Sequence, residues 1–560
     1  MPTRRQPVSF RSAALSVPLA TAVLALAAAP AARAQTVAAP EILGPWIGPG
    51  APVTQPGLAL YGTDLGWTFE HDGTLHLLFG DTWPRVDAVC DPAPTHDDSQ
   101  ATVPLAPPTL GALPPVAFAT DPAAPGEFDR IRLERGGASL SLGFGQVPIA
   151  GFSTGRHAMA LFNRAEPLRC EAGAKDAEPT CPPTAGRSFE RIDRKRGGGL
   201  RCSTGVGECS PPFLGLTFPC DLATGDGCIL ATCQPSPTGF CVDPTSSQND
   251  GTPSSERFAI AQANDFAIQD PGRPTHYRSV AVHHTNKFIN ATVRTVRRFG
   301  GLPQRNDYGP GHGALLVWGR PGYTGEQGRQ AQLYLMAHPL PAQLDRQGAW
   351  RFRPRFFAGV HPRTGRPRWT RLESRAKPLA LDGQMGGDPF EKLPIVDQMA
   401  ISWVGDPIRK WVMLYGGDLD DAFLADPANA RPGPGPGSIQ IRFAEHPWGP
   451  WSPPEPHLVP GSPAVAGDPY GPDGVLFHPE CDDLPGAACA PTDPHRPLHA
   501  FIPGCLSLGL FEPGYFYAPN IVDAWTRPDG AGGVQLYWNV STWNPYAVLL
   551  IRTTLRPTPP

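Results

Sequence analysis

Apolar residues recur along the chain in short runs, and turn-forming residues separate these runs. Examples are TLHLLFGDT at 74–82, RHAMALFNR at 156–164, YRSVAVHHT from residue 277 and GALLVWGR at 313–320. Short runs that are continuous or alternating in hydrophobicity, bounded by Gly, Pro and Asp, are typical of β-strands. The pattern therefore predicts a chain built mainly from β-strands.

Several of these runs form pairs across a short turn. In QMAISWVGDPIRKWVMLYGG, at 398–417, one strand ends near Val404 and the next begins near Trp411. The segment GVQLYWNVSTWNPYAVLLIRTTL, at 533–555, predicts two more strands. Such units recur at intervals of roughly 50 to 100 residues, which favours the blades of a β-propeller. A two-sheet sandwich is the alternative, although its strands are usually spaced more evenly.

Composition agrees with this all-β interpretation. The 560 residues include 71 Pro and 62 Gly, which argues against long helices. The formal net charge is -4, so no overall basic character indicates a nucleic-acid partner. Three long Pro-rich segments, 91–125, 165–250 and 455–500, lack a strand pattern. We expect them to be insertions on the rim of the propeller.

The N-terminal segment has the features of a signal peptide. Three arginines precede an Ala-rich apolar stretch, and Ala32-Arg33-Ala34 provides a small-residue cleavage site. A transmembrane anchor is the alternative, but the apolar stretch is short and no charged stop follows it. The sequence thus predicts a signal peptide at 1–34, a single propeller domain at 35–560 and a secreted or periplasmic protein without a membrane span.

The cysteines cluster in one part of the chain. Eight of the 12 lie between Cys170 and Cys241, in a segment without periodic apolar pattern. In an exported protein such a segment is typical of a disulfide-stapled insertion, here at about 165–250. A zinc cluster is the competing interpretation, but the segment has no CxxC pair and no histidine.

The stretch YGTDLGWTFEHDGTLHLLFGDTWP, at 61–84, carries the candidate chemistry. An aspartate is disfavoured within a strand, so Asp64, flanked by glycines at 62 and 66, calls for a functional reason. Glu70 to Asp72, followed by Gly73, instead match an exposed hairpin turn. Asp81 stands at a strand end, where it can serve the site or cap a loop.

This stretch is similar to the opening blade of the DUF4185 family of exported bacterial proteins. The segments KWVMLYGG, RFAEHPWGPWS and STWNPYAVLLIRTTL resemble later landmarks of that family, in the same order. The resemblance implies a five-bladed β-propeller related to the endo-D-arabinanases of glycoside hydrolase family 183. The order of an Asp, a strand, the DG dipeptide and a second strand also resembles the first blade of the glycosidase propellers that cut arabinans and fructans, and this resemblance implies that Asp64 is the catalytic base or nucleophile.

One position departs from the family pattern. A Gly-Glu pair often precedes the strand before KWVMLYG in the family, whereas this chain has Asp397-Gln398. If that glutamate takes part in catalysis in relatives, this chain has altered or lost it.

Glycoside hydrolysis requires two carboxyl groups, one protonated and one ionised. We expect Asp64 to be one of them, with Asp81 and Asp397 as the other catalytic candidates. The candidate substrate-binding residues are Trp83, Asp98, Gln398, Arg442, Glu480 and Asn544. Asp98 and Glu480 are further candidates for the acid, Arg442 can instead cap a blade, and an aromatic residue in a blade is more often core than a sugar platform.

The sequence predicts no metal and no cofactor. Adjacent strand residues point to opposite faces, so His283 and His284 cannot both ligate one ion without a bulge. Two functions follow. The first is an exported glycoside hydrolase, with a polysaccharide such as an arabinan as substrate and a monomer as the expected state. The alternative is a propeller that binds carbohydrate or protein without turnover.

Overall fold

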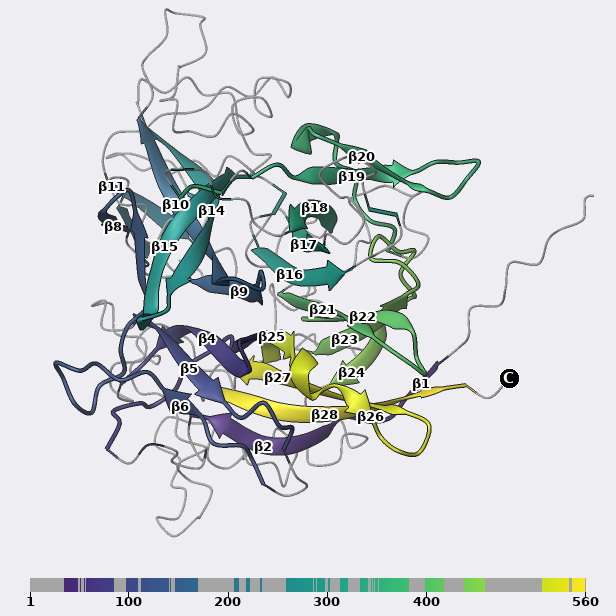
Figure 1. Ribbon diagram of the computed structural model, residues 1–560, viewed down its shortest axis with the longest axis horizontal. Coiled ribbons are helices and arrows are strands. Elements are labelled where there is room, and N and C mark those ends of the chain that lie inside the picture. Colours follow the sequence, from purple (N-terminus) through teal and green to yellow (C-terminus); the bar gives the residue numbers. More distant parts are fainter. Residues whose placement is uncertain are drawn as a thin grey trace, which may run out of the picture.

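The strands of the computed structural model are arranged as the blades of a propeller (Figure 1). The structure describes residues 35–48, 51, 55, 57–84, 97–108, 112–140, 142, 147–169, 206–210, 218–221, 232–233, 258–285, 287–288, 290–297, 301–302, 313–320, 333–340, 344, 346, 348–350, 352–381, 398–416, 438–458, 516–542 and 546–558. The predicted signal peptide lies outside these residues.

The first three blades follow one another along the chain. Blade 1 consists of β3 (Trp67–His71), β4 (Thr74–Thr82), β5 (Asp97–Val103) and β6 (Ala117–Phe118). The prediction that 91–125 is a rim insertion without strands was therefore wrong for β5 and β6, which belong to the blade. Blade 2 consists of β9 (Pro148–Ser153), β10 (Ala158–Arg169), β14 (Phe258–Asp270) and β15 (Arg273–His284), extended by β7 (Arg132–Arg135) and β8 (Ala138–Leu140). Blade 3 consists of β16 (Asn290–Arg297), β17 (Gly313–Arg320), β18 (Tyr334–Leu340), β19 (Arg355–Val360) and β20 (Pro367–Thr370), and the 3-10 turn η3 (Glu373–Arg375) follows it.

Two further blades complete the ring. Blade 4 consists of β21 (Met399–Val404), β22 (Lys410–Gly416), β23 (Ile439–Ala444) and β24 (Glu455–Leu458). Blade 5 contains β25 (Phe516–Ile521), β26 (Arg527–Pro528), β27 (Val534–Thr542) and β28 (Ala547–Pro557), with the 3-10 turn η6 (Asp523–Trp525) after β25. The innermost strands β3, β9, β16, β21 and β25 contact one another in this order, and β25 returns to β3. This closed ring confirms the predicted all-β, five-bladed propeller.

The two ends of the described chain meet in blade 5. Strands β1 (Gln35–Val37) and β2 (Glu41–Ile47) both pair antiparallel with β28. The N-terminal strands therefore cover the outer edge of the sheet formed by the C-terminal strands. This pairing closes the ring, and it brings blade 5 beside blade 1 although they lie at opposite ends of the sequence.

The cysteine-rich segment begins and ends within blade 2. Strands β10 and β14 pair directly, from Met159 with Ile268 to Arg169 with Phe258, so the segment leaves and re-enters through neighbouring strands. Within it, β11 (Val206–Ser210), β12 (Phe218–Asp221) and β13 (Thr232–Cys233) form a separate sheet. The side chains of this segment are outside the described part of the structure, so its disulfides stay a prediction.

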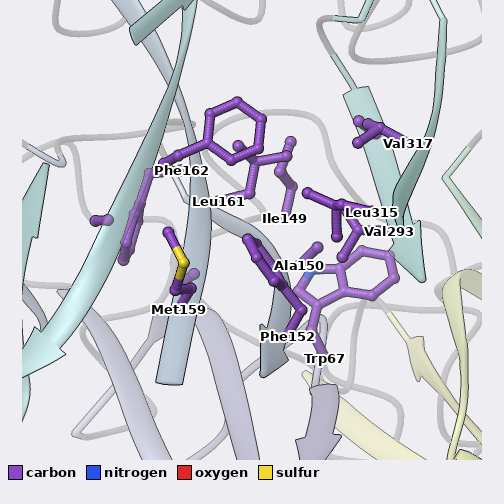
Figure 2. Close-up of a cluster of buried hydrophobic side chains, with 14 of the residues drawn as sticks. Trp67, Ile149, Ala150, Phe152, Met159, Leu161, Phe162, Val293, Leu315 and Val317 are labelled. Atoms are coloured by element: carbon purple, nitrogen blue, oxygen red, sulfur yellow. The ribbon is translucent and has the colours of Figure 1, made fainter. Parts of the chain in front are cut away.

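Most of the hydrophobic core lies between blades. Figure 2 shows Trp67 of blade 1, Phe152 of blade 2 and Val293 of blade 3 in one buried cluster. Full burial of a side chain such as Phe or Leu stabilises a fold by about 1.5–3 kcal/mol, so these contacts fix neighbouring blades against each other. Separate clusters join blades 3 and 4, blades 4 and 5, and blades 5 and 1.

The local turn chemistry agrees with the sequence. Asp72 and Gly73 link β3 to β4 with φ of 47° and 74°, as a tight hairpin turn requires. The turn predicted after Val404 links β21 to β22. Among the described residues, no helix has the length and apolar character needed to cross a membrane.

Candidate functional site

The candidate site lies where the innermost strands of blades 1 and 5 meet. Asp64 stands just before β3, and Tyr517 is the second residue of β25. In a meander of four strands the last strand returns to the end at which the first begins, so the innermost strands all begin at one end of the ring. Asp64 and Tyr517 therefore lie at that end, together with Asp81 near the end of β4.

Blade 5 holds the backbone around Asp64 in an unusual conformation. Leu65 has a φ of 68° and Gly66 a φ of 67°. The hydroxyl Oγ of Ser541 accepts a hydrogen bond from the Leu65 amide at 2.8 Å. The side-chain amides of Asn520 and Asn539 donate to the Gly66 carbonyl at 2.8 and 2.9 Å. A positive φ at leucine costs on the order of 1–3 kcal/mol and persists only where surrounding contacts impose it, as these do.

The Asp64 carboxyl is buried, with only 9% of the residue exposed. The Tyr517 hydroxyl donates to its Oδ2 at 3.0 Å, and the Tyr546 hydroxyl also hydrogen-bonds to the carboxyl. Oδ1 is buried and has no hydrogen-bond partner among the described residues. A buried carboxyl oxygen without a partner disfavours the ionised form, because nothing replaces the water that burial removes.

The electrostatics of Asp64 follow from this burial. Burial raises the pKa of Asp64 well above its usual value, and the charge of Asp81 raises it further. The hydrogen bonds from Tyr546 and Tyr517 act in the opposite direction. Burial, followed by the charge of Asp64, also raises the pKa of Tyr546, so its hydroxyl keeps its proton and can donate. Asp64 is therefore a carboxyl that the fold favours in the protonated form.

Asp81, another predicted acid, lies close enough to Asp64 for its charge to act on the Asp64 carboxyl. Asp81 on β4 pairs with Asp98 on β5, and the register shifts between Phe79 and Asp81. Gly80 occupies this irregular position, and a Cβ there would lie 2.5 Å from Asp64 Oδ1. Only glycine leaves enough room for the Asp64 carboxyl at this point. Asp81 is partly exposed, whereas Asp98 is buried.

A hydrogen-bonded chain of three buried hydroxyls, those of Thr63, Thr82 and Ser99, fixes the backbone at Gly80. Thr82 Oγ1 lies 2.8 Å from Thr63 Oγ1 and 2.7 Å from Ser99 Oγ, and it donates to the Gly80 carbonyl at 2.8 Å. These hydroxyls tie together the segment before β3, the end of β4 and the start of β5. Asp64, Asp81, Tyr517 and Tyr546 are called the Asp64 cluster from here on.

The other predicted site residues have different surroundings. The Trp83 ring is buried and lies edge-on to Tyr546, with ring centres 6.4 Å apart, so it packs against a residue of the Asp64 cluster. Arg442 on β23 is fully buried, and its guanidinium donates to the Tyr415 hydroxyl and the Ser452 carbonyl. Arg442 was predicted either to bind substrate or to cap its blade, and this placement fits the second role.

Four predicted positions are not brought to the Asp64 cluster by any described contact. Gln398 directly precedes β21, is buried, and its Oε1 has no hydrogen-bond partner in the described part of the chain. Asp397, Glu480 and Asn544 lie outside the described residues. Their predicted roles stay predictions.

Sequence reasoning missed the two tyrosines of the Asp64 cluster. Tyr517 is 453 positions from Asp64 in the sequence, and only the closure of the ring makes them neighbours. The signal that could have found Tyr546 is its position between the turn-forming residues Trp543-Asn544-Pro545 and the start of the predicted last strand.

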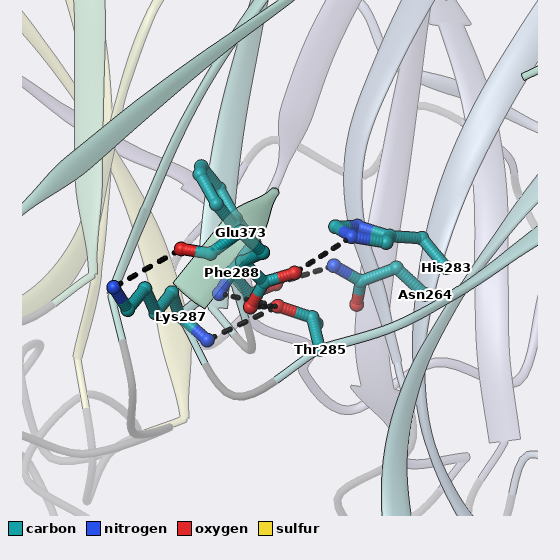
Figure 3. A network of polar contacts seen from close by, with 6 residues as sticks. All are labelled: Asn264, His283, Thr285, Lys287, Phe288 and Glu373. Atoms are coloured by element: carbon teal, nitrogen blue, oxygen red, sulfur yellow. Dashed lines mark hydrogen bonds and ion pairs between the residues drawn. The ribbon is translucent and has the colours of Figure 1, made fainter. Parts of the chain in front are cut away.

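A second buried carboxyl lies between blades 2 and 3, shown in Figure 3. Glu373 Oε2 lies 2.9 Å from His283 Nε2, and its Oε1 accepts a hydrogen bond from the Thr285 hydroxyl at 2.8 Å. The Lys287 ammonium donates to the carbonyls of Glu373 and Ala376 at 3.2 and 2.9 Å. Glu373, His283, Thr285 and Lys287 are called the Glu373 cluster. His283 thus has a carboxylate partner, and no group of three or more potential metal ligands occurs among the described residues.

Comparisons with known proteins add little to this description. No protein-family model matches the chain, and no curated protein matches it, so the resemblance to the DUF4185 family stays a prediction. An exo-inulinase from Aspergillus awamori aligns with a TM-score of 0.28 and 9% identity over 91% of this chain and 63% of that chain. A mutant Trypanosoma rangeli sialidase displaying trans-sialidase activity aligns with a TM-score of 0.28 and 7% identity over 93% and 58%.

The chain therefore spans about three fifths of the length of these two structures. Similarity at this level does not bear on the activity of the chain. The propeller architecture instead rests on its strand pairing and on the closed ring of innermost strands.

Proposed function

We propose that the protein is a glycoside hydrolase that acts on a polysaccharide, with Asp64 and Asp81 as its pair of carboxyl groups. The observation that carries this proposal is the buried Asp64 carboxyl, whose pKa is raised by burial and by the neighbouring charge of Asp81. Two adjacent carboxyls whose environments separate their protonation states are what glycosidic cleavage requires.

The environments favour one assignment of roles. Asp64, held in the protonated form, donates its proton to the glycosidic oxygen as the bond from that oxygen to the anomeric carbon breaks. Asp81, which is partly exposed, is the ionised partner. It either attacks the anomeric carbon or removes a proton from the water that does so, and water completes the hydrolysis. This reverses the role of Asp64 implied by the family resemblance, in which it is the base or nucleophile.

The substrate and the location of the reaction follow from the sequence. The N-terminal segment predicts export, so the substrate is a polysaccharide of the cell surface or the surroundings. Arabinan is the first candidate, because it is the substrate class of the family that the sequence resembles. We also propose that the enzyme acts as a monomer.

The test measures product release from D-arabinan, L-arabinan and fructan by chromatography. Asp64→Asn and Asp81→Asn should each reduce turnover by about 100-fold or more, because general acid and base groups typically contribute rate factors of this size or larger. Asp72→Asn, at the exposed hairpin turn, is the matched control and should keep full activity. Wild-type turnover by Asp64→Asn would remove Asp64 from the mechanism.

Burial of Asp64 supports a second candidate function. The Asp64 residue is only 9% exposed, and Tyr517 and Tyr546 of blade 5 hydrogen-bond to its carboxyl. Asp64 can therefore also serve to attach blade 5 to blade 1 in a propeller that binds carbohydrate without cleaving it. In that case the protein binds one of the three polysaccharides without releasing product, and Asp64→Asn leaves the dissociation constant unchanged.

A further inference from the structure

The hairpin of β19 and β20, with the segment that follows it, is strongly basic. Residues 353–377 contain eight of the 47 Lys and Arg of the chain, but only one of its 51 Asp and Glu. The whole chain has a net charge of -4, so this positive charge is local. In Figure 1 the hairpin extends outward at the edge of blade 3.

Most of these charges face solvent. The exposed basic side chains of the segment are Arg353, Arg363, Arg366, Arg368, Arg371, Arg375 and Lys377, and they are called the basic face. Within the described part of the structure, no acidic side chain forms an ion pair with any of them. The segment thus presents seven exposed cationic side chains.

The single acid of the segment does not neutralise the basic face. Glu373 points inward, and its carboxylate contacts His283 and Thr285 in the Glu373 cluster (Figure 3). Its side chain is 0% exposed. The same contacts attach the segment to blade 2 and so hold the backbone that carries the basic face in a fixed position.

Strand geometry places several of the charges together. Arg366 directly precedes β20, and its carbonyl accepts a hydrogen bond from the His361 amide at 2.7 Å, which extends the strand pairing by one position. Residues two apart in such an extended segment point to the same side, so Arg366 and Arg368 project from one face of the hairpin. Val360 pairs with Pro367, and the turn between them carries Arg363. By strand register this turn lies at the end of blade 3 where β16 begins, which is also the end of the ring where Asp64 lies.

We propose that the basic face binds an anionic polysaccharide, one with a carboxylate or sulfate group on most of its sugars. The proposal deepens the proposed function by naming the charge class of the polymer, and it rests on that function for the choice of a polysaccharide. Guanidinium groups pair with planar anions through two parallel hydrogen bonds, and seven of the eight basic residues in the segment are arginines.

A polysaccharide fits better than a nucleic acid for two reasons. Fifty of the 51 acidic residues lie outside the segment, so the rest of the molecule repels any polyanion in proportion to its charge, and it repels a duplex with one charge per about 1.7 Å more strongly than a polymer with one charge per sugar. The only tryptophan of the segment, Trp369, packs against Phe357 and donates its ring N–H to the Gly301 carbonyl. It therefore does not form the row of free aromatic rings on which single-stranded bases stack.

The test measures dissociation constants for polygalacturonate, dextran sulfate and neutral dextran. The protein carries Asp64→Asn, so that binding is read without turnover. We expect both anionic probes to bind and dextran not to bind at about 0.1 M salt, and we expect binding to be lost at about 1 M, where charges are screened within roughly 3 Å. The variant Arg363→Glu/Arg366→Glu/Arg368→Glu should weaken binding of the anionic probes by about 10-fold or more.

The matched control reverses three exposed arginines elsewhere, at Arg132, Arg156 and Arg409, with the same change in net charge. It should keep its affinity within about threefold, because only charges within a Debye length act on the bound polymer. The neutral variant Arg363→Gln/Arg366→Gln/Arg368→Gln, checked for an unchanged melting temperature, serves if the charge-reversed variant does not fold.

Three results would overturn the proposal. These are no binding of either anionic probe by the parent protein, an equal loss of affinity in the control, or tighter binding of single-stranded DNA than of polygalacturonate. Binding that depends on the basic face, in a protein that hydrolyses none of the tested polymers, would instead support this inference and count against the proposed function.

Discussion

Among the described residues, the buried carboxyl groups of Asp64 and Glu373 both lie at junctions between blades, and their surroundings differ. Glu373 has both oxygens hydrogen-bonded, to His283 and Thr285. Asp64 has one oxygen bonded to Tyr517 and another, Oδ1, without a partner among the described residues. The charged neighbour of Asp64 is another acid, Asp81. Glu373 is thus stabilised in place, whereas Asp64 is held in an unfavourable environment.

Under the proposed function, this is the difference expected between a structural carboxyl and a functional one. Burying a charge costs free energy unless hydrogen bonds or an opposite charge compensate it, as they do for Glu373. The hydrogen bonds from Tyr517 and Tyr546 compensate the burial of Asp64 only in part, because burial and the charge of Asp81 still raise its pKa. A fold that keeps such a group, on a backbone with a positive φ at Leu65, retains a residue that lowers its stability. Such groups concentrate at functional sites. The comparison therefore makes opposite predictions for the removal of the two carboxyls.

The largest expected effect is the loss of the Glu373 carboxylate. Glu373→Ala leaves His283 and Thr285 buried without their partner and releases the segment that follows β20. We expect the free energy of unfolding to fall by about 3–5 kcal/mol, as when one partner of a buried pair is removed. Denaturant unfolding at constant pH measures this loss.

The control for this prediction is Glu70→Ala, at the exposed end of β3, which should change stability by less than about 0.5 kcal/mol. The folded fraction of Glu373→Ala should keep its specific activity, since Glu373 does not touch the Asp64 cluster in any described contact. A loss below about 1 kcal/mol would contradict the view that this cluster joins blades 2 and 3.

Removing the charge of Asp64 should have the opposite sign. At neutral pH the unfolded carboxyl is ionised, whereas the folded one resists ionisation, because its pKa is raised by burial and by Asp81. Asp64→Asn removes this cost, so we expect the free energy of unfolding to rise by on the order of 1–3 kcal/mol at pH 7, while catalysis is lost.

The pH dependence gives the decisive control for Asp64→Asn. The pKa of Asp64 is higher in the folded state than in the unfolded state, where it is about 3.9. The contribution of Asp64 to the free energy of unfolding is therefore fully present below about pH 3.9, and it is lost as the pH rises through the pKa of the folded state. The gain from Asp64→Asn should therefore be present at pH 7 and vanish below about pH 4. A gain that persists unchanged at low pH would show that removal of charge is not its cause.

The sequence identified the parts of the site that depend on local signals. Asp64 stood out because glycines flank it and because strands disfavour aspartate, although the structure places it just before β3 and not within a strand. The hairpin turn at Asp72 and Gly73 followed from its dipeptide. The pairing of Asp81 with Asp98 depends on the shift of register after Phe79. A shift of one residue reverses which face each side chain occupies, so the strand pattern alone did not determine this pairing.

The parts that sequence reasoning missed depend on contacts between blades. Tyr517 meets Asp64 across 453 positions, and Glu373 meets His283 across 90. In the sequence, Glu373 is one acid within a run of arginines and would be expected in solvent. Its burial follows from how η3 packs against blade 2, which no local pattern encodes. The propeller architecture was predictable, because most blades are local units of consecutive strands, whereas the number of five blades came from the resemblance to the DUF4185 family.

The smallest expected effect comes from the hydrogen bond between Tyr517 and Asp64. This bond lowers the pKa of Asp64 against the larger effect of burial, so Tyr517→Phe should raise that pKa further. If Asp64 donates the proton during cleavage, the alkaline limb of the pH dependence of kcat/KM should move to higher pH. Stability should fall by only about 0.5–1.5 kcal/mol, the usual net contribution of one hydrogen bond.

Tyr415→Phe, whose hydroxyl accepts from Arg442 inside blade 4, is the matched control and should leave the limb in place. An alkaline limb that stays fixed or moves down in Tyr517→Phe would mean that Asp64 is not the group that titrates there, and the distinction between the two buried carboxyls would then lose its functional meaning.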